Sequence, residues 1–255
     1  MTSALPQPPP PLPADAIFLD FDGTLVDIAE TPGGIRPDPQ LPHLIDKVRT
    51  ALSGRVAVLT GRAIETVDRF LSPQKLPIAG LHGLEHRAAD GSITSRPVPA
   101  QALQSAREAL RGFTEAHPGT ELEDKRLGLA LHFRRAPQAQ TAARAAVDQA
   151  IRDAGPLLTV QPGKMVYEIK VSGVDKGKAL ETFMKSAPFC GARPVMLGDD
   201  LTDETAFAAA ERQGGFGILV GALRDTRARY HLPNVPACHH WLHRLTSSDA
   251  AGSEP

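Results

Sequence analysis

The feature that most constrains the fold is a set of short, mainly apolar runs, each followed by polar or turn residues and alternating with helical patterns. The runs are Ala16–Leu19, Arg55–Leu59, Pro194–Leu197 and Phe216–Val220. Apolar runs of this length, bounded by turn residues, are typical of strands buried on both faces. Apolar residues recur at helical spacing over 41–52, 64–71, 178–186 and 203–213. This alternation predicts an α/β fold with a doubly wound, parallel sheet core.

A different pattern interrupts the alternation in the middle of the chain. Large apolar residues alternate with small or polar ones over 127–134 and again over 165–171. A period of two predicts half-buried antiparallel strands. Further strands are expected near 120–124 and 157–161, and helices at 102–113 and 139–151. We therefore predict an inserted α+β domain at 98–171 within a discontinuous core domain at 15–97 and 172–255.

The composition and the chain ends exclude several classes of protein. Residues 1–14 are rich in proline, lack a signal-peptide pattern, and are predicted to be an extended or disordered leader. A net charge of -1 gives no support for a nucleic-acid or membrane partner, and no apolar run is long enough to span a bilayer. Two distant cysteines, Cys190 and Cys238, do not make a disulfide framework. We expect a cytoplasmic protein that is a monomer or a weak oligomer.

Acidic residues gather where the predicted strands end. Asp20 and Asp22 are two apart in extended chain, so their carboxylates point the same way, and Asp199 and Asp200 follow another strand. Such a group at one sheet edge requires a cation or raised pKa values, and its hard oxygen ligands suit Mg²⁺. Each motif alone also fits a structural role, as a turn or a helix N-cap. Their joint placement favours the cation site.

Positive partners for an anionic substrate are also present. Lys176 begins a predicted helix, where a cation is unfavourable unless it meets an anion. Thr60, Gly61 and Arg62 open another helix and offer backbone N–H groups for a phosphate, although Thr60 alone could be an N-cap. With a cation and Lys176 neutralising repulsion, Asp20 could attack phosphorus, and Asp22 could exchange protons with the leaving oxygen and the incoming water.

These four segments, in this order, resemble the motifs of the haloacid dehalogenase superfamily. They are Asp20-Phe-Asp22-Gly-Thr24-Leu, Thr60-Gly-Arg62, Lys176 and Gly198-Asp199-Asp200-Leu-Thr-Asp203-Glu. The resemblance implies that Asp20 is the nucleophile and Asp22 the acid/base, and that Thr60 and Lys176 hold the phosphate. It also implies Mg²⁺ bound by Asp20, the Asp22 carbonyl and Asp199, supported by Asp200 and Asp203. Gly23, Thr24, Gly61 and Arg62 are expected to line the substrate site.

The place of the inserted domain is similar to that in superfamily members with a C2-type cap, and the chain resembles most the trehalose-6-phosphate phosphatases over nearly all of 15–222. The segments that carry this resemblance are Gly80–Glu85, Leu122–Lys125, Leu131–Arg134 and Gly163–Lys170. It implies hydrolysis of trehalose 6-phosphate. The substrate-binding residues expected from these segments are His82, Gly83, Glu123, Lys125, His132, Arg134, Lys164 and Glu168.

The residues of the inserted domain are consistent with sugar recognition. On the 127–134 strand, the face opposite the leucines holds Gly128, Ala130, His132 and Arg134, and small residues beside two polar ones leave room for a ligand. Lys164 and Glu168 share a face of another strand. Charged side chains can grip sugar hydroxyls as donors and acceptors. The alternative is a solvated sheet face with cross-strand ion pairs.

Three other functions remain open from the sequence. The same chemistry could act on sucrose 6-phosphate or mannosyl-3-phosphoglycerate. A receiver domain also carries a phosphorylated aspartate on such a sheet, but Asp22 and the inserted domain argue against it. A sugar-phosphate sensor without turnover is disfavoured because Asp20 and Asp22 are both present. The segment 238–243, with a cysteine and three histidines, lacks zinc-site spacing and is interpreted as a surface or helix-packing segment.

Overall fold

The computed structural model of the chain describes residues 5–28, 38–71, 76–125, 128–163 and 165–247. These residues form two compact units. One is continuous, Pro97–Gly173, and the other combines the chain before Pro97 with the chain from Val174 onward. We call them the inserted unit and the core unit. The two breaks lie within two residues of the boundaries expected from the change in apolar period.

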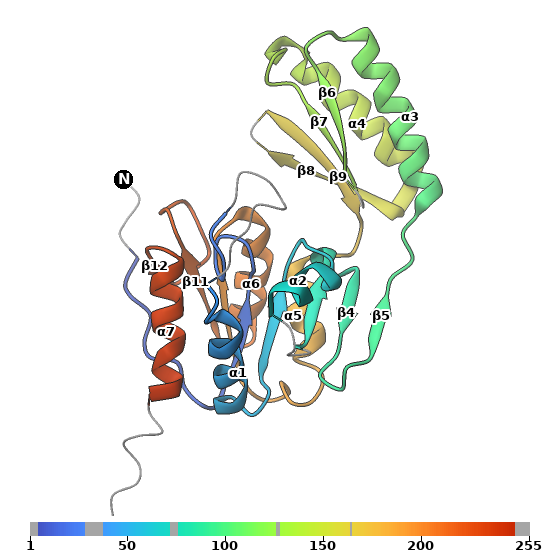
Figure 1. The fold of residues 1–255 in the computed structure, drawn as a ribbon. Helices are drawn as coiled ribbons and strands as arrows, with labels where there is room; N and C mark the ends of the chain where they lie inside the picture. Colours follow the sequence, from blue (N-terminus) through green and yellow to red (C-terminus); the bar gives the residue numbers. More distant parts are fainter. Residues whose placement is uncertain (1–4, 29–37, 72–75, 126–127, 164, 248–255) are drawn as a thin grey trace, which may run out of the picture. The chain divides into compact units, whose positions relative to one another are not determined.

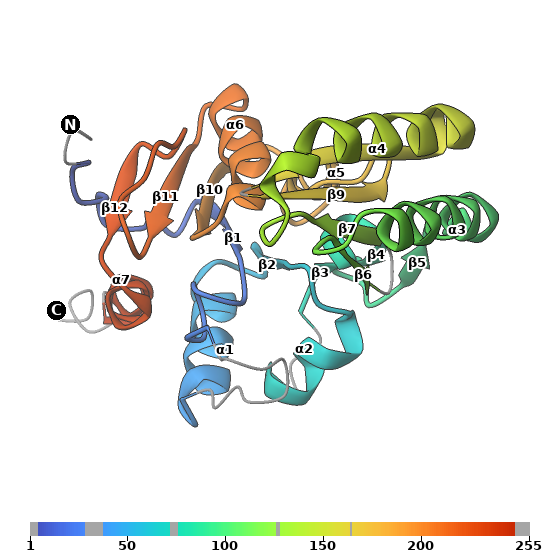
Figure 2. The same ribbon diagram turned by 90° about the horizontal axis from the view of Figure 1, so that it is seen from above.

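The core unit (Figure 1) is built on an eight-stranded sheet. The strand order is β12-β11-β10-β1-β2-β3-β4-β5, as the labels of Figure 2 show. Its strands are β1 (Asp15–Leu19), β2 (Val56–Leu59), β3 (Ile78–Gly80), β4 (Glu85–Arg87), β5 (Ile93–Ser95), β10 (Arg193–Gly198), β11 (Phe216–Val220) and β12 (Tyr230–Leu232). The pairs from β12 to β3 are parallel, whereas β3, β4 and β5 pair antiparallel. The predicted doubly wound α/β fold is confirmed, and the antiparallel edge is an addition to it.

Helices cover both faces of this sheet (Figure 2). One face carries α1 (Leu41–Ala51), α2 (Ile64–Leu71) and α7 (Val235–Ser247), and the other carries α5 (Lys176–Phe183) and α6 (Glu204–Arg212). In β1, Ile17 and Leu19 face the first group, while Ala16 and Phe18 face the second. Because both faces are buried, every residue of β1 is apolar except Asp15, whose carboxylate pairs with Arg193 at 2.9 Å.

The inserted unit is a four-stranded antiparallel sheet with helices on one face. Its elements are α3 (Ala100–Ala116), β6 (Glu121–Lys125), β7 (Gly128–His132), α4 (Gln140–Ala154), β8 (Leu158–Gly163) and β9 (Val166–Val171), with sheet order β6-β7-β9-β8. Leu129 and Leu131 of β7 and Tyr167 and Ile169 of β9 pack with apolar residues of α3 and α4. The residues between them on each strand occupy the opposite face. The alternation in the sequence is matched by the burial of β9, whereas in β7 Gly128 and Ala130 are buried along with the two leucines, so the prediction of a half-buried strand is wrong for β7.

The proline-rich leader corrects one prediction. From residue 5 onward it lies against the core unit: Pro6 O accepts a hydrogen bond from His231 N at 3.0 Å, and Pro9 O accepts one from Trp241 Nε1 at 2.7 Å. Pro8 and Pro11 are buried. The expected disorder is therefore wrong for residues 5–14, and residues 1–4 lie outside the described part. Proline has no N–H to satisfy, so an extended proline-rich segment presents carbonyls that neighbouring donors can use.

The last helix of the described chain completes the core unit. Helix α7 contains the cysteine- and histidine-bearing segment, and it packs on α1. Cys238 and Trp241 are buried in the shared core, and His239 Nε2 lies 2.9 Å from Leu25 O. These contacts agree with the helix-packing interpretation. Among the described residues, no helix combines the length and the apolar character needed to cross a bilayer.

Candidate active site

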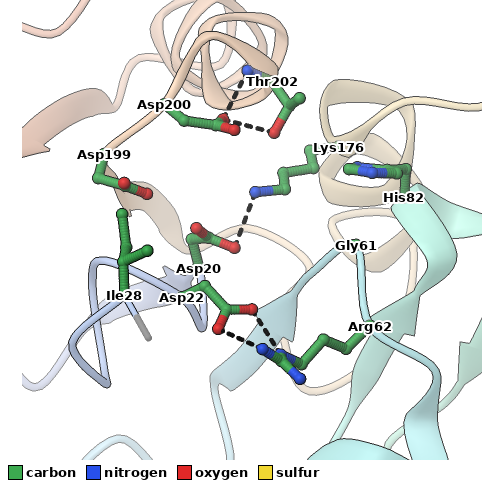
Figure 3. Close-up of a pocket in the computed structure, with 10 residues that line it drawn as sticks. All are labelled: Asp20, Asp22, Ile28, Gly61, Arg62, His82, Lys176, Asp199, Asp200 and Thr202. Atoms are coloured by element: carbon green, nitrogen blue, oxygen red, sulfur yellow. Dashed lines mark hydrogen bonds and ion pairs between the residues drawn. The ribbon is translucent and has the colours of Figure 1, made fainter. Parts of the chain in front are cut away.

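The polar residues predicted to meet at one sheet edge do meet there. Strand β1 pairs with β10 on one side and β2 on the other, with Leu19 beside Leu197 and Val58. The residues that follow these strands therefore emerge together, and the first residue of α5 joins them. A pocket of about 460 Å³ lies at this edge (Figure 3). Its lining residues all belong to the core unit: Asp20, Asp22, Ile28, Gly61, Arg62, His82, Lys176, Asp199, Asp200 and Thr202.

Lys176 is the buried cation of the pocket. Its Nζ lies 2.8 Å from Asp20 Oδ1 and 2.7 Å from Asp203 Oδ1, and its side chain is 3% exposed. Asp175 caps α5 by accepting a hydrogen bond from Lys178 N, which places Lys176 at the first turn. Burial alone would lower the pKa of Lys176, but the charges of Asp20 and Asp203 outweigh it and raise that pKa. The lysine is therefore charged at neutral pH.

The acidic groups around Lys176 carry more negative charge than one lysine can neutralise. Burial raises the pKa of Asp20 to about 7, against the opposing effect of Lys176. Burial, with the charge of Asp203, raises the pKa of Asp199 to about 6, and burial with the charge of Asp20 raises that of Asp203 to about 7. Raised carboxyl pKa values of this kind mark a site that favours a further cation.

The arrangement of oxygens fits a divalent cation. Carboxylate oxygens of Asp20, Asp199 and Asp203 lie within 4.8 Å of one another. Asp203 is already committed, because its Oδ1 accepts from Lys176 and its Oδ2 accepts from Asp199 N and Asp200 N at 3.0 and 3.1 Å. Asp199 Oδ1, in contrast, is buried without a hydrogen-bond partner among the described residues. An orphaned buried carboxylate oxygen beside Asp20 is what a cation ligand requires before the ion binds.

The sequence left open whether Asp200 belongs to the cation site or caps a helix, and the structure shows features of both. It lines the pocket, and its Oδ1 also caps the short helix η4 (Leu201–Asp203) by accepting hydrogen bonds from Thr202 N and Oγ1, both at 2.6 Å. Burial would raise the pKa of Asp200, but the charge of Lys176 and the bonds from Thr202 lower it. Asp200 is therefore an ionised residue that shapes the loop.

Asp22 and Arg62 form a bidentate pair that the sequence did not predict. Arg62 Nε lies 2.6 Å from Asp22 Oδ2, and its Nη2 lies 2.8 Å from Asp22 Oδ1. Thr60, predicted to hold phosphate, is buried, and its Oγ1 accepts a hydrogen bond from Arg62 N at 3.1 Å. Thr60 thus acts as a local cap, and it is not among the described residues that line the pocket.

Glycine at position 23 permits the close approach of two loops. Gly23 has φ +81°, and a Cβ added there would lie 2.2 Å from Asp199 Oδ2. Thr24 is fully buried, and its Oγ1 has no partner among the described residues. Of the core residues expected to bind substrate, Gly61, Arg62 and His82 line the pocket, whereas Gly23, Thr24 and Gly83 lie outside its described lining. Gly23 instead brings the loop after β1 against Asp199.

His82 is held above Gly61 by an unusual backbone. Leu81 and His82 both have positive φ, 52° and 58°. His82 N donates to Thr60 O at 2.8 Å, and Leu81 N donates to Arg62 O at 2.9 Å. Non-glycine residues in this region cost conformational energy and are enriched at functional sites. The segment that follows β3 is therefore bonded directly to the loop that follows β2.

The inserted unit carries part of its predicted residue set on its polar face. In the sheet register, Ala130 lies between Glu123 and Glu168. Glu123 Oε2 lies 3.0 Å from His132 Nε2, and Glu168 Oε2 lies 3.1 Å from Lys170 Nζ. Arg134 is exposed in the turn after β7. Lys164 and the side chain of Lys125 lie outside the description. Glu123 and His132 thus meet between β6 and β7, and Glu168 and Lys170 form an ion pair along β9, so contacts typical of a solvated face are present alongside the predicted residues.

The fold and the pocket together define a class, and the comparisons define the family. Solved phosphatases, one of them from the haloalkanoate (HAD) enzyme superfamily, share the fold, and the family model and the relatives described below show that this chain is a phosphatase. The chain belongs to the trehalose-phosphatase family, whose model matches residues 18–236. Membership in this family implies a divalent metal, and the oxygens described above fit one.

Several relatives match along most of their length. The chain is 39% identical over 240 residues to a probable trehalose-phosphate phosphatase of Sinorhizobium fredii, covering 94% of this chain and 82% of that protein. It is 36% identical over 248 residues to the trehalose-6-phosphate phosphatase of Escherichia coli, covering 97% and 92%. The solved trehalose-6-phosphate phosphatase of Aspergillus fumigatus has a TM-score of 0.75 at 24% identity, covering 91% and 92%, and shows the shared fold.

Besides the pairing of Asp22 with Arg62, sequence reasoning missed one residue that lines the pocket and one that supports its acidic loop. Ile28 lines the pocket although it is 72% exposed. Arg224, in the loop after β11, contacts the backbone of both Asp199 and Asp200. Neither belongs to a motif with a chemical signature. A lone arginine after a buried strand is indistinguishable, in sequence, from any solvated arginine.

Proposed function

We propose that this chain is a Mg²⁺-dependent phosphatase that hydrolyses trehalose 6-phosphate to trehalose and phosphate through an aspartyl-phosphate on Asp20. The observation that carries the proposal is the position of Lys176, 2.8 Å from Asp20, near Oδ1 of Asp199, a buried oxygen that no described residue partners. A carboxylate can attack a phosphate dianion only where cations offset the repulsion. The substrate is proposed because the full-length relatives bear the names of trehalose-phosphate phosphatases.

The chemical steps use the two aspartates that follow β1. An oxygen of Asp20 attacks phosphorus, the bond from phosphorus to the sugar oxygen breaks, and that oxygen takes a proton from Asp22. A water molecule then gives a proton to Asp22 and attacks phosphorus. The Asp20–phosphorus bond breaks, phosphate leaves, and both carboxyl groups are restored. Lys176 stabilises the charge of the transferring group in both steps.

The divalent cation has a defined place in this scheme. Asp20 and Asp199 would bind the cation, together with the Asp22 carbonyl that the superfamily resemblance implies. Asp203 would hold the loop of Asp199 and Asp200 through their backbone N–H groups. When bound, the ion neutralises phosphate oxygens and lowers the pKa values of the surrounding carboxyl groups. Mg²⁺ is proposed because the site consists of hard oxygen ligands.

Arg62 orients Asp22, the proposed acid/base. Both carboxylate oxygens of Asp22 are engaged by Arg62. An acid/base must be held within reach of the leaving oxygen, and a bidentate pair restricts the carboxylate to one orientation. For proton transfer, one of the two hydrogen bonds from Arg62 to Asp22 must break, so that the freed carboxylate oxygen can contact the substrate oxygen.

Sugar recognition is proposed for the polar face of the inserted unit. Glu123 and Glu168 flank the small residue Ala130, and His132 lies beside Glu123. Arg134, Lys125 and Lys164 complete the proposed set. Two carboxylates separated by an alanine can accept hydrogen bonds from adjacent sugar hydroxyls, while the basic residues donate to them. Discrimination between sugar phosphates would depend on this set.

A phosphate-release panel tests the proposal. With Mg²⁺ present, trehalose 6-phosphate should give a higher kcat/KM than sucrose 6-phosphate, glucose 6-phosphate or mannosyl-3-phosphoglycerate. Asp20→Asn should abolish turnover of every substrate while circular dichroism shows an intact fold. A higher kcat/KM for another sugar phosphate would overturn the substrate assignment. Residual turnover by the Asp20→Asn variant would overturn the nucleophile.

A further inference from the structure

We infer that Arg224 is a positioning residue of the divalent-cation site, which it serves by holding the main chain of Asp199 and Asp200. The inference rests on the proposed function and adds a residue that none of the four sequence motifs contains. Arg224 lies in the loop that joins β11 to β12. Its side chain reaches back to the end of β10, the neighbouring strand, where the acidic loop begins.

The contacts of the guanidinium are directed at carbonyl oxygens. Nη2 donates to Asp200 O at 2.6 Å, and Nε donates to Asp199 O at 3.2 Å. Nη1 donates to Asp225 O at 3.0 Å and to the carboxylate of Glu204. One side chain thus binds two successive carbonyls of the acidic loop. A planar guanidinium can do this because its donors diverge in a fixed fork, which a lysine ammonium lacks.

Asp203 holds the same two residues through their other main-chain groups. Its Oδ2 accepts from Asp199 N at 3.0 Å and from Asp200 N at 3.1 Å. Both amide groups of the pair therefore bond to Asp203, and both carbonyls bond to Arg224. The main chain of Asp199 and Asp200 is clamped through all four polar groups. The Asp199 carboxylate remains, with Oδ1 buried and unpartnered among the described residues.

Glu204 orients Arg224 in turn. Besides pairing with Nη1, Glu204 accepts from Thr226 Oγ1 and from Arg227 N, both at 2.7 Å. The first residue of α6 thereby ties the loop after β11 to the loop after β10. Arg224 and Glu204 are each about one-fifth exposed. The pair is partly shielded from solvent and linked to the backbone at both ends, so it holds one geometry.

Such an arrangement lowers the cost of binding a cation. A metal ligand on a loose loop must be ordered when the ion arrives, whereas a clamped loop is ordered on folding. Outer partners that orient metal ligands typically change metal affinity roughly tenfold to hundredfold when they are removed. We therefore expect Arg224 to set the affinity of the site rather than to contact the substrate.

Binding of Mn²⁺ to the purified full chain, measured by the electron paramagnetic resonance of free Mn²⁺, tests this inference. Arg224→Ala should bind Mn²⁺ roughly tenfold to hundredfold more weakly than the wild type. Arg224→Lys should also bind more weakly, because it cannot reach both carbonyls and Glu204 together. Arg227→Ala is the matched control, since this exposed neighbour meets Glu204 through its backbone N–H, and its Mn²⁺ affinity should be unchanged.

The outcomes separate this inference from the proposed function. If the wild type binds no Mn²⁺ and releases no phosphate, the proposed function fails and the inference fails with it. If the wild type does both and the folded Arg224→Ala variant binds Mn²⁺ as tightly, the inference alone is overturned. Should Arg224→Ala not fold, Arg224→Lys decides by the same comparison. For a positioning role, saturating Mn²⁺ should restore kcat in the Arg224 variant, with KM for trehalose 6-phosphate near the wild-type value.

Discussion

Lys176 Nζ lies 2.8 Å from Asp20 Oδ1 and 2.7 Å from Asp203 Oδ1, so a lysine that begins the helix after the inserted unit joins the aspartate after β1 to the acidic loop after β10. All three side chains are nearly excluded from solvent. The pocket is thus organised around one buried cation shared by two carboxylates. Beside them, Oδ1 of Asp199 is buried and has no hydrogen-bond partner among the described residues.

Replacing Lys176 with Met should damage both stability and catalysis. The change leaves Asp20 and Asp203 buried without their cation, which costs about 3–5 kcal/mol in the free energy of unfolding. Loss of the charge that stabilises the transferring phosphoryl group should lower kcat roughly a hundredfold to a thousandfold. Urea unfolding and phosphate release measure the two effects. Lys178→Met, two residues along the same helix at an exposed pair, should leave both nearly unchanged. Wild-type kcat in the Lys176 variant would refute its assigned role.

Gly23→Ala should abolish activity for a steric reason. The new Cβ would lie 2.2 Å from Asp199 Oδ2, so the loop after β1 or the Asp199 carboxylate must move. Gly91→Ala is the matched control: Gly91 has φ +86°, close to the +81° of Gly23, but nothing lies within 4 Å of its added Cβ. The Gly91→Ala control should lose about 1–2 kcal/mol in the free energy of unfolding, because alanine is strained in left-handed backbone, and it should keep full activity. Equal kcat/KM in the two variants would contradict this account.

Without a divalent cation, stability should fall as pH rises from 5 to 8. The pKa values of Asp20, Asp199 and Asp203 rise on folding to about 7, 6 and 7. In this window the unfolded chain has released those protons while the folded chain still binds them, so the free energy of unfolding decreases with pH. Urea unfolding in chelator at pH 5 and pH 8 measures the change. Excess Mg²⁺ should reduce it, because the ion offsets the carboxylate charges. Stability that is flat or increasing in chelator would show that these groups do not titrate as described.

Glu168→Ala should separate sugar recognition from phosphate chemistry. Glu168 lies on the polar face of the inserted unit, beside Ala130 in the sheet register. Loss of a hydrogen bond between a charged group and a sugar hydroxyl should raise KM for trehalose 6-phosphate roughly tenfold. KM for p-nitrophenyl phosphate, which lacks the sugar, should not change. Glu108→Ala, at an exposed position of α3, is the control and should affect neither substrate. A similar rise in KM for both substrates would remove Glu168 from recognition of the sugar.

The elements that the sequence predicted well have a strong local signal. Strands β1, β2, β10 and β11 are apolar runs apart from Asp15 and Arg193 at the first positions of β1 and β10, and the period of two in β9 matches its alternating burial. The short strands β3, β4, β5 and β12 have three residues each, too few to produce a pattern. They form because neighbouring strands offer unpaired backbone groups. The leader is ordered for a related reason, since Pro6 and Pro9 accept from His231 and Trp241.

The sequence by itself determined which chemistry the core can carry. Residue type, spacing and position after buried strands place Asp20, Asp22 and Asp199 at one edge, because parallel strands end together. Only the tertiary structure decided which partners those groups have. Arg62 pairs with the Asp22 carboxylate, and Arg224, from another loop, donates a hydrogen bond to Asp200 O. Such pairings depend on side-chain distances between segments far apart in the chain. Local periodicity and residue type contain no information about those distances.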